Sequence, residues 1–273
     1  KTATSTYNSV DGTPFKRDII KEMADACQRN GIKLHLYYSH LDWGREDYPQ
    51  GRTGLGTGRD KGKANWSSYY KFMNTQLTEL LTHYGPIGAV WFDGWWDHDS
   101  DAKPFDWQLP EQYAMIHKLQ PQCLIGNNHH QTPFAGEDIQ IFERDLPGEN
   151  KAGLSGQSIS RLSLESCQTI NEHWGYNITD TLYKSPKELI QMLVRTAGKN
   201  ANLLLNIGPE PGGALPELAL NRLQAIGEWL NKYGETIYGT RGGIVAPHDW
   251  GVSTQRGNKL YIHILNCMDS SLF

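Results

Sequence analysis

The sequence predicts an α/β fold, a TIM-like (β/α) barrel followed by the start of a β-sandwich domain. Stretches with helical periodicity alternate with short apolar runs that are typical of buried strands, the pattern of repeated βα units in a parallel sheet. A chain of 273 residues has room for such a barrel. No GxGxxG motif follows a predicted strand, which counts against an open dinucleotide-binding sheet.

The first predicted helix begins at Thr13-Pro14, because Thr is a favoured N-cap and Pro a favoured first helical residue. Asn30-Gly31 ends it with residues that tolerate a left-handed backbone. Apolar residues recur every four positions on one face of this helix: Phe15, Ile19, Met23 and Cys27. The next predicted elements are a strand over 32–38, a helix over 69–84, a strand over 87–92, a helix over 110–119 and a strand over 123–125.

The second half continues the alternation. A strand is predicted over 139–142, and Ser185-Pro186-Lys187-Glu188 is a capping box that opens a helix to Ala197. A central strand over 201–207 and a long helix over 216–233 follow. After Gly234 the chain becomes rich in Gly and β-branched residues, and 260–265 is a clear strand. We therefore predict a catalytic barrel domain over 1–238 and the start of a C-terminal β-domain over 239–273.

Composition excludes several classes of function. A net charge of −4 gives no electrostatic reason to bind nucleic acid or an anionic membrane. No apolar run approaches the roughly 20 residues of a membrane span. The four cysteines are far apart and form no CxxC, which disfavours a disulfide framework or a zinc site. The chain has 9 Trp and 13 Tyr but only 7 Phe, a bias that suits a surface for sugar rings as well as a large core.

Asp93 is the sharpest candidate for chemistry. It ends an apolar strand, and the active sites of (β/α) barrels lie at the carboxyl ends of the strands. Trp91, Trp95 and Trp96 surround it in sequence. A carboxylate among aromatic faces suits attack on the anomeric carbon of a sugar, whereas the alternative is an Asp that only caps a turn.

A retaining glycosidase needs a second carboxyl group about 5–5.5 Å from the first. Glu143 follows the strand over 139–142, so we expect it at the same end of the barrel. The sequence alone places no pair within this distance. The acidic residues available downstream of Asp93 are Glu137, Asp138, Glu143, Asp145, Glu149 and Glu165.

Metal sites have weak support. Asp97, Asp99 and Asp101 resemble the start of a calcium loop, but Ala102 and Gln108 stand where an EF-hand needs Gly and Glu. A solvated acidic loop is the favoured interpretation, and we predict no metal. A metal-dependent hydrolase that uses Asp97, His98 and Asp99 is the alternative.

These residues lie in stretches that resemble glycoside hydrolase family 29, the α-L-fucosidases. The resemblance covers roughly residues 5–245, with consistent order and spacing. The stretches that carry it are Tyr7-Asn8-Ser9-Val10, Leu36-Tyr37-Tyr38-Ser39, Gly88-Ala89-Val90-Trp91-Phe92-Asp93-Gly94, His173-Trp174-Gly175-Tyr176-Asn177 and Asn202-Leu203-Leu204-Leu205-Asn206-Ile207-Gly208-Pro209.

The resemblance implies a retaining exo-α-L-fucosidase that needs no cofactor. Asp93 matches the nucleophile; Glu143 aligns best with the acid/base, with Glu137 in reserve. The residues that match contacts to the sugar are Tyr38, Trp91, Asn128, His129 and Trp174. The implied substrate is a fucosylated oligosaccharide or glycoconjugate, and the implied location is secreted or periplasmic.

One departure from the family concerns the barrel itself. The family carries a His-His-Asp-Gly-Phe motif on a strand before the Tyr7 segment, and this sequence begins after it. We therefore expect the first barrel strands and most of the C-terminal β-domain to be missing. A catalytically degenerate barrel that binds fucose or another carbohydrate is the alternative function.

Overall fold

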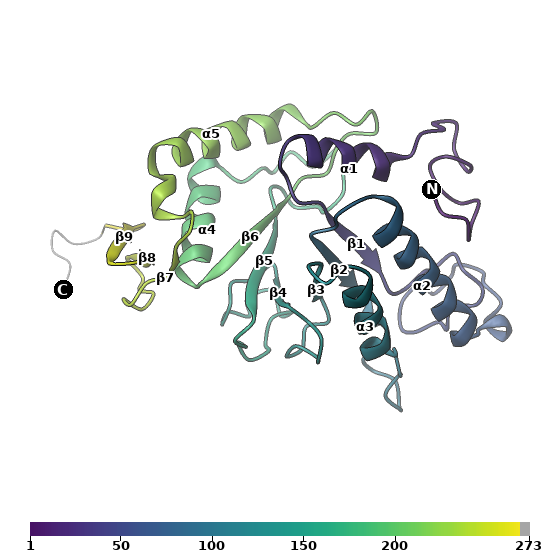
Figure 1. Ribbon diagram of the computed structural model, residues 1–273. Coiled ribbons are helices and arrows are strands. Elements are labelled where there is room, and N and C mark those ends of the chain that lie inside the picture. The colour runs from purple at the N-terminus through teal and green to yellow at the C-terminus, as the bar shows by residue number, and fades with distance from the viewer. Residues whose placement is uncertain (268–273) are drawn as a thin grey trace. The chain divides into compact units, whose positions relative to one another are not determined.

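The structure is a computed structural model, and it describes residues 1–267. The chain forms two compact units. The first comprises Lys1–His129 and Pro133–Gln140, and the second comprises His130–Thr132 and the residues from Ile141 onward. Figure 1 shows the order of their helices and strands along the chain. The predicted domain boundary at 238/239 stays a prediction.

The first unit is built on parallel strands in chain order. These are β1 (His35–Ser39), β2 (Ala89–Asp93), β3 (Leu124–Asn127) and the beginning of β4 (Ile139–Glu143). In register, β1 pairs with β2 from His35↔Ala89 to Ser39↔Asp93, and β2 pairs with β3 from Ala89↔Leu124 to Phe92↔Asn127. The sheet therefore brings the carboxyl ends of β1 and β2 together at Ser39 and Asp93.

Three helices accompany these strands: α1 (Ile19–Arg29), α2 (Trp66–His83) and α3 (Leu109–Leu119). Helix α2 buries Tyr69, Met73, Leu77 and Leu81, which recur every four residues on one face. The core that they join also contains Val90 and Phe92 of β2 and Tyr113 and Ile116 of α3. Two short 3₁₀ turns, η1 (Lys61–Lys63) and η2 (Trp95–His98), lie in the connecting loops.

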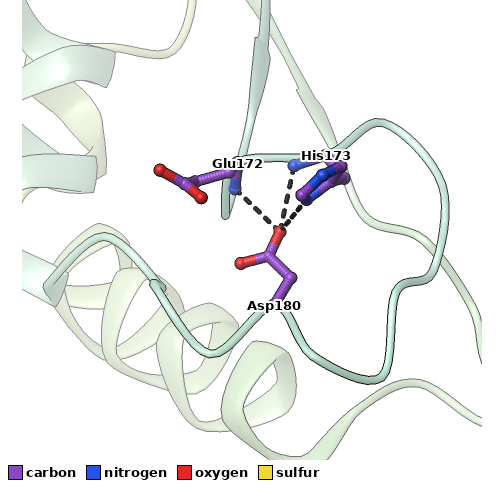
Figure 2. Close-up of side chains that lie close together, drawn as sticks. All are labelled: Glu172, His173 and Asp180. Atoms are coloured by element: carbon purple, nitrogen blue, oxygen red, sulfur yellow. Dashed lines mark hydrogen bonds and ion pairs between the residues drawn. The ribbon is translucent and has the colours of Figure 1, made fainter.

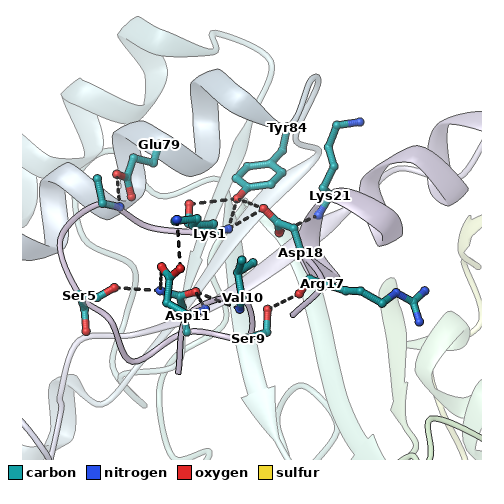
Figure 3. Close-up of polar contacts among 12 residues, drawn as sticks. Lys1, Ser5, Ser9, Val10, Asp11, Arg17, Asp18, Lys21, Glu79 and Tyr84 are labelled. Carbon is teal, nitrogen blue, oxygen red and sulfur yellow. Dashed lines mark hydrogen bonds and ion pairs between the residues drawn. The ribbon is translucent and has the colours of Figure 1, made fainter. Parts of the chain in front are cut away.

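The predicted start of the first helix at Thr13-Pro14 is wrong. Helix α1 begins at Ile19, and Asp18 is its N-cap, whose side chain accepts a hydrogen bond from the Lys21 amide. Thr13 instead accepts a hydrogen bond from the Phe15 amide, and Lys16 has a φ of 56°, which no helix contains. Polar contacts attach the preceding segment to α2 and to Tyr84 at its C-cap (Figure 3), among them the Tyr84 hydroxyl on Asp18 at 3.0 Å.

The second unit holds the end of β4 with β5 (Ser163–Thr169) and β6 (Ala201–Asn206), which are neighbours in that order. Strands β5 and β6 are parallel, from Leu164↔Ala201 to Thr169↔Asn206. Helices α4 (Pro186–Gly198) and α5 (Glu217–Tyr233) follow β5 and β6 in the chain. The predicted capping box at Ser185 and Glu188 is present at the start of α4, with both of its hydrogen bonds.

A small antiparallel sheet ends the described chain. It contains β7 (Arg241–Gly242), β8 (Gly251–Arg256) and β9 (Lys259–Ile264), preceded by the turn η3 (Gly234–Thr236). Residues 268–273 of the predicted β-domain lie outside the described residues. Within residues 1–267 the parallel strands number six, where a complete (β/α) barrel has eight. The predicted fold class, an incomplete TIM-like (β/α) barrel followed by the start of a β-domain, is confirmed by the parallel strands and the small antiparallel sheet after them, whereas the sandwich form of that domain stays a prediction. None of the described helices is long and apolar enough to span a membrane.

Candidate active site

The register of β1 and β2 decides which side chains surround Asp93. Side chains alternate between the two faces of a strand, so Asp93 and Trp91 share one face while Val90 and Phe92 share the buried one. Tyr37 is directly opposite Trp91 in β1, and their rings are stacked with centroids 5.6 Å apart. The face that carries Asp93 is therefore lined by aromatic rings.

Three donors hold the Asp93 carboxylate. The Tyr37 hydroxyl donates to Oδ2 at 2.8 Å, the Trp96 indole N–H to Oδ1 at 3.0 Å, and the Asn128 side-chain amide to Oδ1 at 3.4 Å. Gly94 has a φ of 95°, a conformation that favours glycine, and it turns the chain so that Trp96 folds back onto the carboxylate. An ionised carboxylate only accepts hydrogen bonds, so these donors suit and orient a nucleophile.

Asp93 opens into a cavity of about 800 Å³ within the first unit. Tyr37, Ser39 and Trp96 line it beside the carboxylate. The loop after β1 supplies most of the remaining wall, together with two residues of α2 and two of the N-terminal segment: Leu41, Asp42, Trp43, Gly44, Arg45, Phe72, Gln76, Ser5 and Tyr7. This space is large enough for a sugar ring and part of a further residue.

Tyr38 lies on the opposite face from Asp93. Its ring packs edge-on against Phe92, its hydroxyl donates to Oε1 of Gln76 at 2.8 Å, and burial raises the pKa of the phenol. The predicted sugar contact at Tyr38 stays a prediction, and the strand register favours Tyr37 for that position. Tyr37 and Trp96 were missed from the sequence. Ser39 of β1 pairs with Asp93, and Tyr37 lies two residues before Ser39, on the same face of the strand. The register of the two strands would therefore have indicated Tyr37.

Asn128 lies beside the predicted nucleophile, whereas His129 is turned into the protein. The Asn128 backbone N–H donates to the Phe92 carbonyl at 2.8 Å, which places its side chain at Asp93. His129 is buried, with Nε2 3.0 and 3.1 Å from the two carboxylate oxygens of Glu137 and its ring 4.2 Å from that of Phe134. The predicted sugar contact at His129 would require this buried pair to open.

Glu137, the reserve acid/base, is a buried structural carboxylate. Besides His129, it accepts hydrogen bonds from the Tyr113 hydroxyl at 3.0 Å and from the Phe134 amide at 3.1 Å. Its side chain is 1% exposed. Burial, and then the Glu137 charge, raise the pKa of the Tyr113 phenol. A carboxylate with these partners anchors the loop between β3 and β4 and is poorly placed to exchange a proton with a substrate.

Glu143 and Trp174 both lie in the second unit. Glu143 ends β4, is half-buried, and has its Oε2 3.0 Å from Nε2 of His130. Arg144 follows it with a φ of 58°, and its guanidinium lies 4.9 Å above the Trp174 ring. The next residue, Asp145, accepts hydrogen bonds from the amides of Lys151 and Ala152.

Asp180 organises the loop that carries Trp174. Its Oδ2 accepts hydrogen bonds from the amides of Glu172 and His173 at 3.1 and 3.0 Å and lies 2.7 Å from Nδ1 of His173. Figure 2 shows these three side chains and their contacts. The hydrogen bond with His173 is the main reason why the pKa of Asp180 is lowered. In the described part of the chain these three residues are the one group with potential metal ligands within 4.8 Å of one another. Oδ2 of Asp180 already receives three donors from the protein, so we interpret Asp180 as a residue that holds the loop and not as a metal ligand.

The predicted solvated acidic loop is correct for Asp99 and Asp101, which are exposed, but wrong for Asp97, which is buried. Asp97 is fully buried and accepts hydrogen bonds from the Tyr48 hydroxyl and the Thr53 amide, each at 2.7 Å. Burial acts to raise the pKa of Asp97, but the hydrogen bonds from Thr53 and Tyr48 outweigh it and lower the pKa. His98 is held by Asp101 at 2.7 Å. The hydrogen bonds of Asp97 therefore attach the loop 48–53 to η2, although the two segments are far apart in sequence.

Known proteins resemble this chain over most of its length. The sequence model of one family, described as alpha-L-fucosidase, matches residues 1–235. A putative alpha-L-fucosidase of Caenorhabditis elegans is 29% identical over 244 residues, 86% of this chain and 45% of that protein. The plasma alpha-L-fucosidase of Rattus norvegicus is 29% identical over 272 residues, 93% of this chain and 54% of that protein.

The solved structure of alpha-L-fucosidase isoenzyme 1 from Paenibacillus thiaminolyticus has a TM-score of 0.83 and 36% identity. The match covers 97% of this chain and 64% of that one. The chain spans about half the length of the curated relatives that it matches. These matches confirm the family resemblance that the sequence motifs predicted.

Proposed function

Since this chain belongs to the α-L-fucosidase family, we propose that it removes terminal α-L-fucose from glycans by a retaining mechanism. The observation that carries the proposal is the Asp93 carboxylate, which ends β2, receives three hydrogen-bond donors and opens into a cavity of about 800 Å³. A carboxylate that is oriented but still accessible is what nucleophilic attack on an anomeric carbon requires.

The proposed reaction has two steps. In the first, an oxygen of Asp93 bonds to C1 of fucose while the bond from C1 to the glycosidic oxygen breaks, and Glu143 gives that oxygen its proton. In the second, water attacks C1, the Glu143 carboxylate takes a proton from the water, and the ester bond to Asp93 breaks. Fucose leaves with its original anomeric configuration, and both carboxyl groups return to their starting states.

We assign the fucose contacts to Trp91, Tyr37 and Asn128 beside Asp93 and to Trp174 in the second unit. Trp174 is 36% exposed and fixed by Arg144 and by the Asp180 loop, so its ring is available to an apolar edge such as the fucose methyl group. The Tyr38 hydroxyl contacts Gln76 and the His129 ring contacts Glu137. We therefore propose that these two residues support the fucose site without contacting the sugar.

A fucosylated glycan is the substrate class that the comparisons support. An α-L-fucosidase of Lactobacillus casei, with a TM-score of 0.69 and 27% identity, has been solved in complex with its α-L-fucose product. A single-substitution variant of that enzyme has been solved with Fucα(1,6)GlcNAc. We therefore propose Fucα(1,6)GlcNAc as the first natural disaccharide to test.

The decisive experiment traps the covalent intermediate. Incubation with 2-deoxy-2-fluoro-fucosyl fluoride should add one fluorofucosyl group to the peptide that contains Asp93, detected by mass spectrometry. The Asp93→Asn variant should neither be labelled nor hydrolyse an aryl fucoside, whereas Asp249→Asn, at an exposed position, should do both. Fucose binding without labelling or turnover in the unaltered protein would establish the sugar-binding barrel instead.

A further inference from the structure

Trp43 presents an unusually exposed indole to the cavity of the proposed nucleophile. It lines the same cavity as Asp93 and Trp96, yet it is 48% exposed. It contributes to no described aromatic pair, in contrast to Trp66, which contacts four aromatic rings of the core. A large aromatic surface left in a cavity beside a carboxylate indicates a ligand that stacks on it.

The indole is held in a fixed orientation. Its Nε1 donates to Oγ1 of Thr53 at 3.0 Å. Gly54 packs directly against the ring, because a Cβ at that position would lie 2.4 Å from Cδ1 of Trp43. Gly54 also has a φ of 67°, which other residues adopt rarely. Only a glycine therefore lets the backbone approach the indole this closely.

The loop that carries Trp43 is braced although it contains little regular structure. Nη1 of Arg59 donates to the carbonyl oxygens of Arg45 at 2.6 Å and of Asp42 at 3.2 Å, on either side of Trp43. Thr53, the partner of the indole, is in turn fixed through its amide by the buried Asp97 at 2.7 Å. A long loop tied down in this way is typical of a binding loop that is formed before the ligand arrives.

We infer that Trp43 is a stacking platform for the leaving-group sugar, the residue to which fucose is attached. This inference rests on the proposed function. Tyr37, Trp96 and Asn128 already contact the Asp93 carboxylate, so they surround the fucose carbon that Asp93 attacks. Trp43 lies in the same cavity but on the loop beyond the strand end, where the part of the substrate further from that carbon is recognised. The apolar face of a pyranose ring suits a flat indole.

The test compares a substrate that has a leaving-group sugar with one that lacks it. Fucα(1,6)GlcNAc carries the sugar, whereas α-L-fucosyl fluoride loses only a fluoride ion. In Trp43→Ala the ratio of kcat/KM for the disaccharide to kcat/KM for the fluoride should fall about tenfold, mainly through KM for the disaccharide. An unchanged ratio, with both substrates slowed equally or not at all, would overturn the inference.

Three further variants separate stacking from structural damage. Trp43→Phe keeps an aromatic face and should retain the ratio within about threefold. Gly54→Ala forces the indole to move and should lower the ratio as Trp43→Ala does. Leu55→Ala alters an exposed neighbour that does not line the cavity and should leave the ratio as it is. A ratio that falls equally in Leu55→Ala would assign the effect to the loop as a whole.

Failure of the proposed function gives a different result. If the unaltered protein hydrolyses neither substrate and Asp93 is not labelled, the fucosidase proposal fails. Trp43 is then tested by titrating N-acetylglucosamine and recording saturation-transfer NMR spectra. Binding that is lost in Trp43→Ala and kept in Trp43→Phe supports the platform, and equal binding in all three proteins rejects it.

Discussion

The hydroxyl of Tyr37 donates a 2.8 Å hydrogen bond to Oδ2 of Asp93 across the β1–β2 pair. The same phenol ring stacks on Trp91, two residues before Asp93. One tyrosine thus orients the carboxylate and completes an aromatic wall on the same face of the sheet. Trp96 and Asn128 donate to Oδ1 of Asp93, whereas Tyr37 donates to Oδ2. Both oxygens of the carboxylate are therefore held by donors.

Tyr37→Phe should reduce catalysis while keeping the stack on Trp91. The loss of a hydrogen bond to a charged group corresponds to about 1.5–3 kcal/mol, so kcat/KM for an aryl fucoside should fall about 10- to 100-fold. Tyr38→Phe is the matched comparison, because its hydroxyl contacts Gln76 on the other face, and its loss should be clearly smaller. A larger fall in kcat/KM in Tyr38→Phe than in Tyr37→Phe would show that Tyr38, and not Tyr37, contacts the sugar.

Glu143→Ala should show the behaviour of a missing acid/base. Hydrolysis of a fucoside with a poor leaving group should slow by about 10²–10⁴-fold, and an activated aryl fucoside should be affected less in the first step. Azide needs no general base, so it should restore turnover by forming fucosyl azide. Glu172→Ala, which removes an exposed carboxylate from the same unit, should need no rescue. Absence of a rescue product in Glu143→Ala would exclude Glu143.

Glu137→Gln should affect stability more than chemistry. The carboxylate accepts hydrogen bonds from the Tyr113 hydroxyl and the Phe134 amide and contacts His129, all in a buried site. A glutamine turns an N–H₂ group toward one of these donors, so the free energy of unfolding should fall by about 2–4 kcal/mol. Glu111→Gln, exposed on α3, should change it by less than about 0.5 kcal/mol in denaturant titrations. Normal stability with azide-rescued activity in a Glu137 variant would identify Glu137 as the acid/base.

Local sequence signals predicted some parts of this molecule well. Strand β2 and its terminal Asp93 were predicted because an apolar run ends in a carboxylate and a glycine, and both features are local. The capping box at Ser185 was predicted for the same reason. The Thr13-Pro14 signal failed because the same residues also favour turns, and Asp18 offered a cap nearer to the periodic segment.

Other features depend on contacts that one segment does not encode. Strand β5, Ser163–Thr169, was missed because its polar sequence lacks a strand pattern, and its burial comes from its neighbours. The choice between Tyr37 and Tyr38 required the register with β2, since adjacent residues of one type give no contrast. Glu137 and Glu143 are both acidic residues near β4, and only the partners of Glu137 show which one is buried.

His40 makes the stability of this protein sensitive to mild acid. It is fully buried against Phe92, with ring centroids 4.3 Å apart, and its Nε2 donates to Oε1 of Gln112 at 2.7 Å. Burial lowers the pKa of His40 from 6.5 to about 4. Between these two pH values the unfolded chain binds a proton that the folded protein does not.

The free energy of unfolding should therefore fall as the pH drops from 6.5 to about 4, by about 1.4 kcal/mol per pH unit from this group alone. Above pH 6.5 the ring is neutral in both states, and below about 4 it is charged in both, so the slope from His40 ends at these limits. His40→Asn keeps a hydrogen-bonding side chain but cannot titrate. Its unfolding free energy should be lower at neutral pH, and the difference from the unaltered protein should narrow toward pH 4. Denaturant titrations at half-unit steps of pH measure both profiles, and two parallel profiles would show that His40 is not held neutral by its burial.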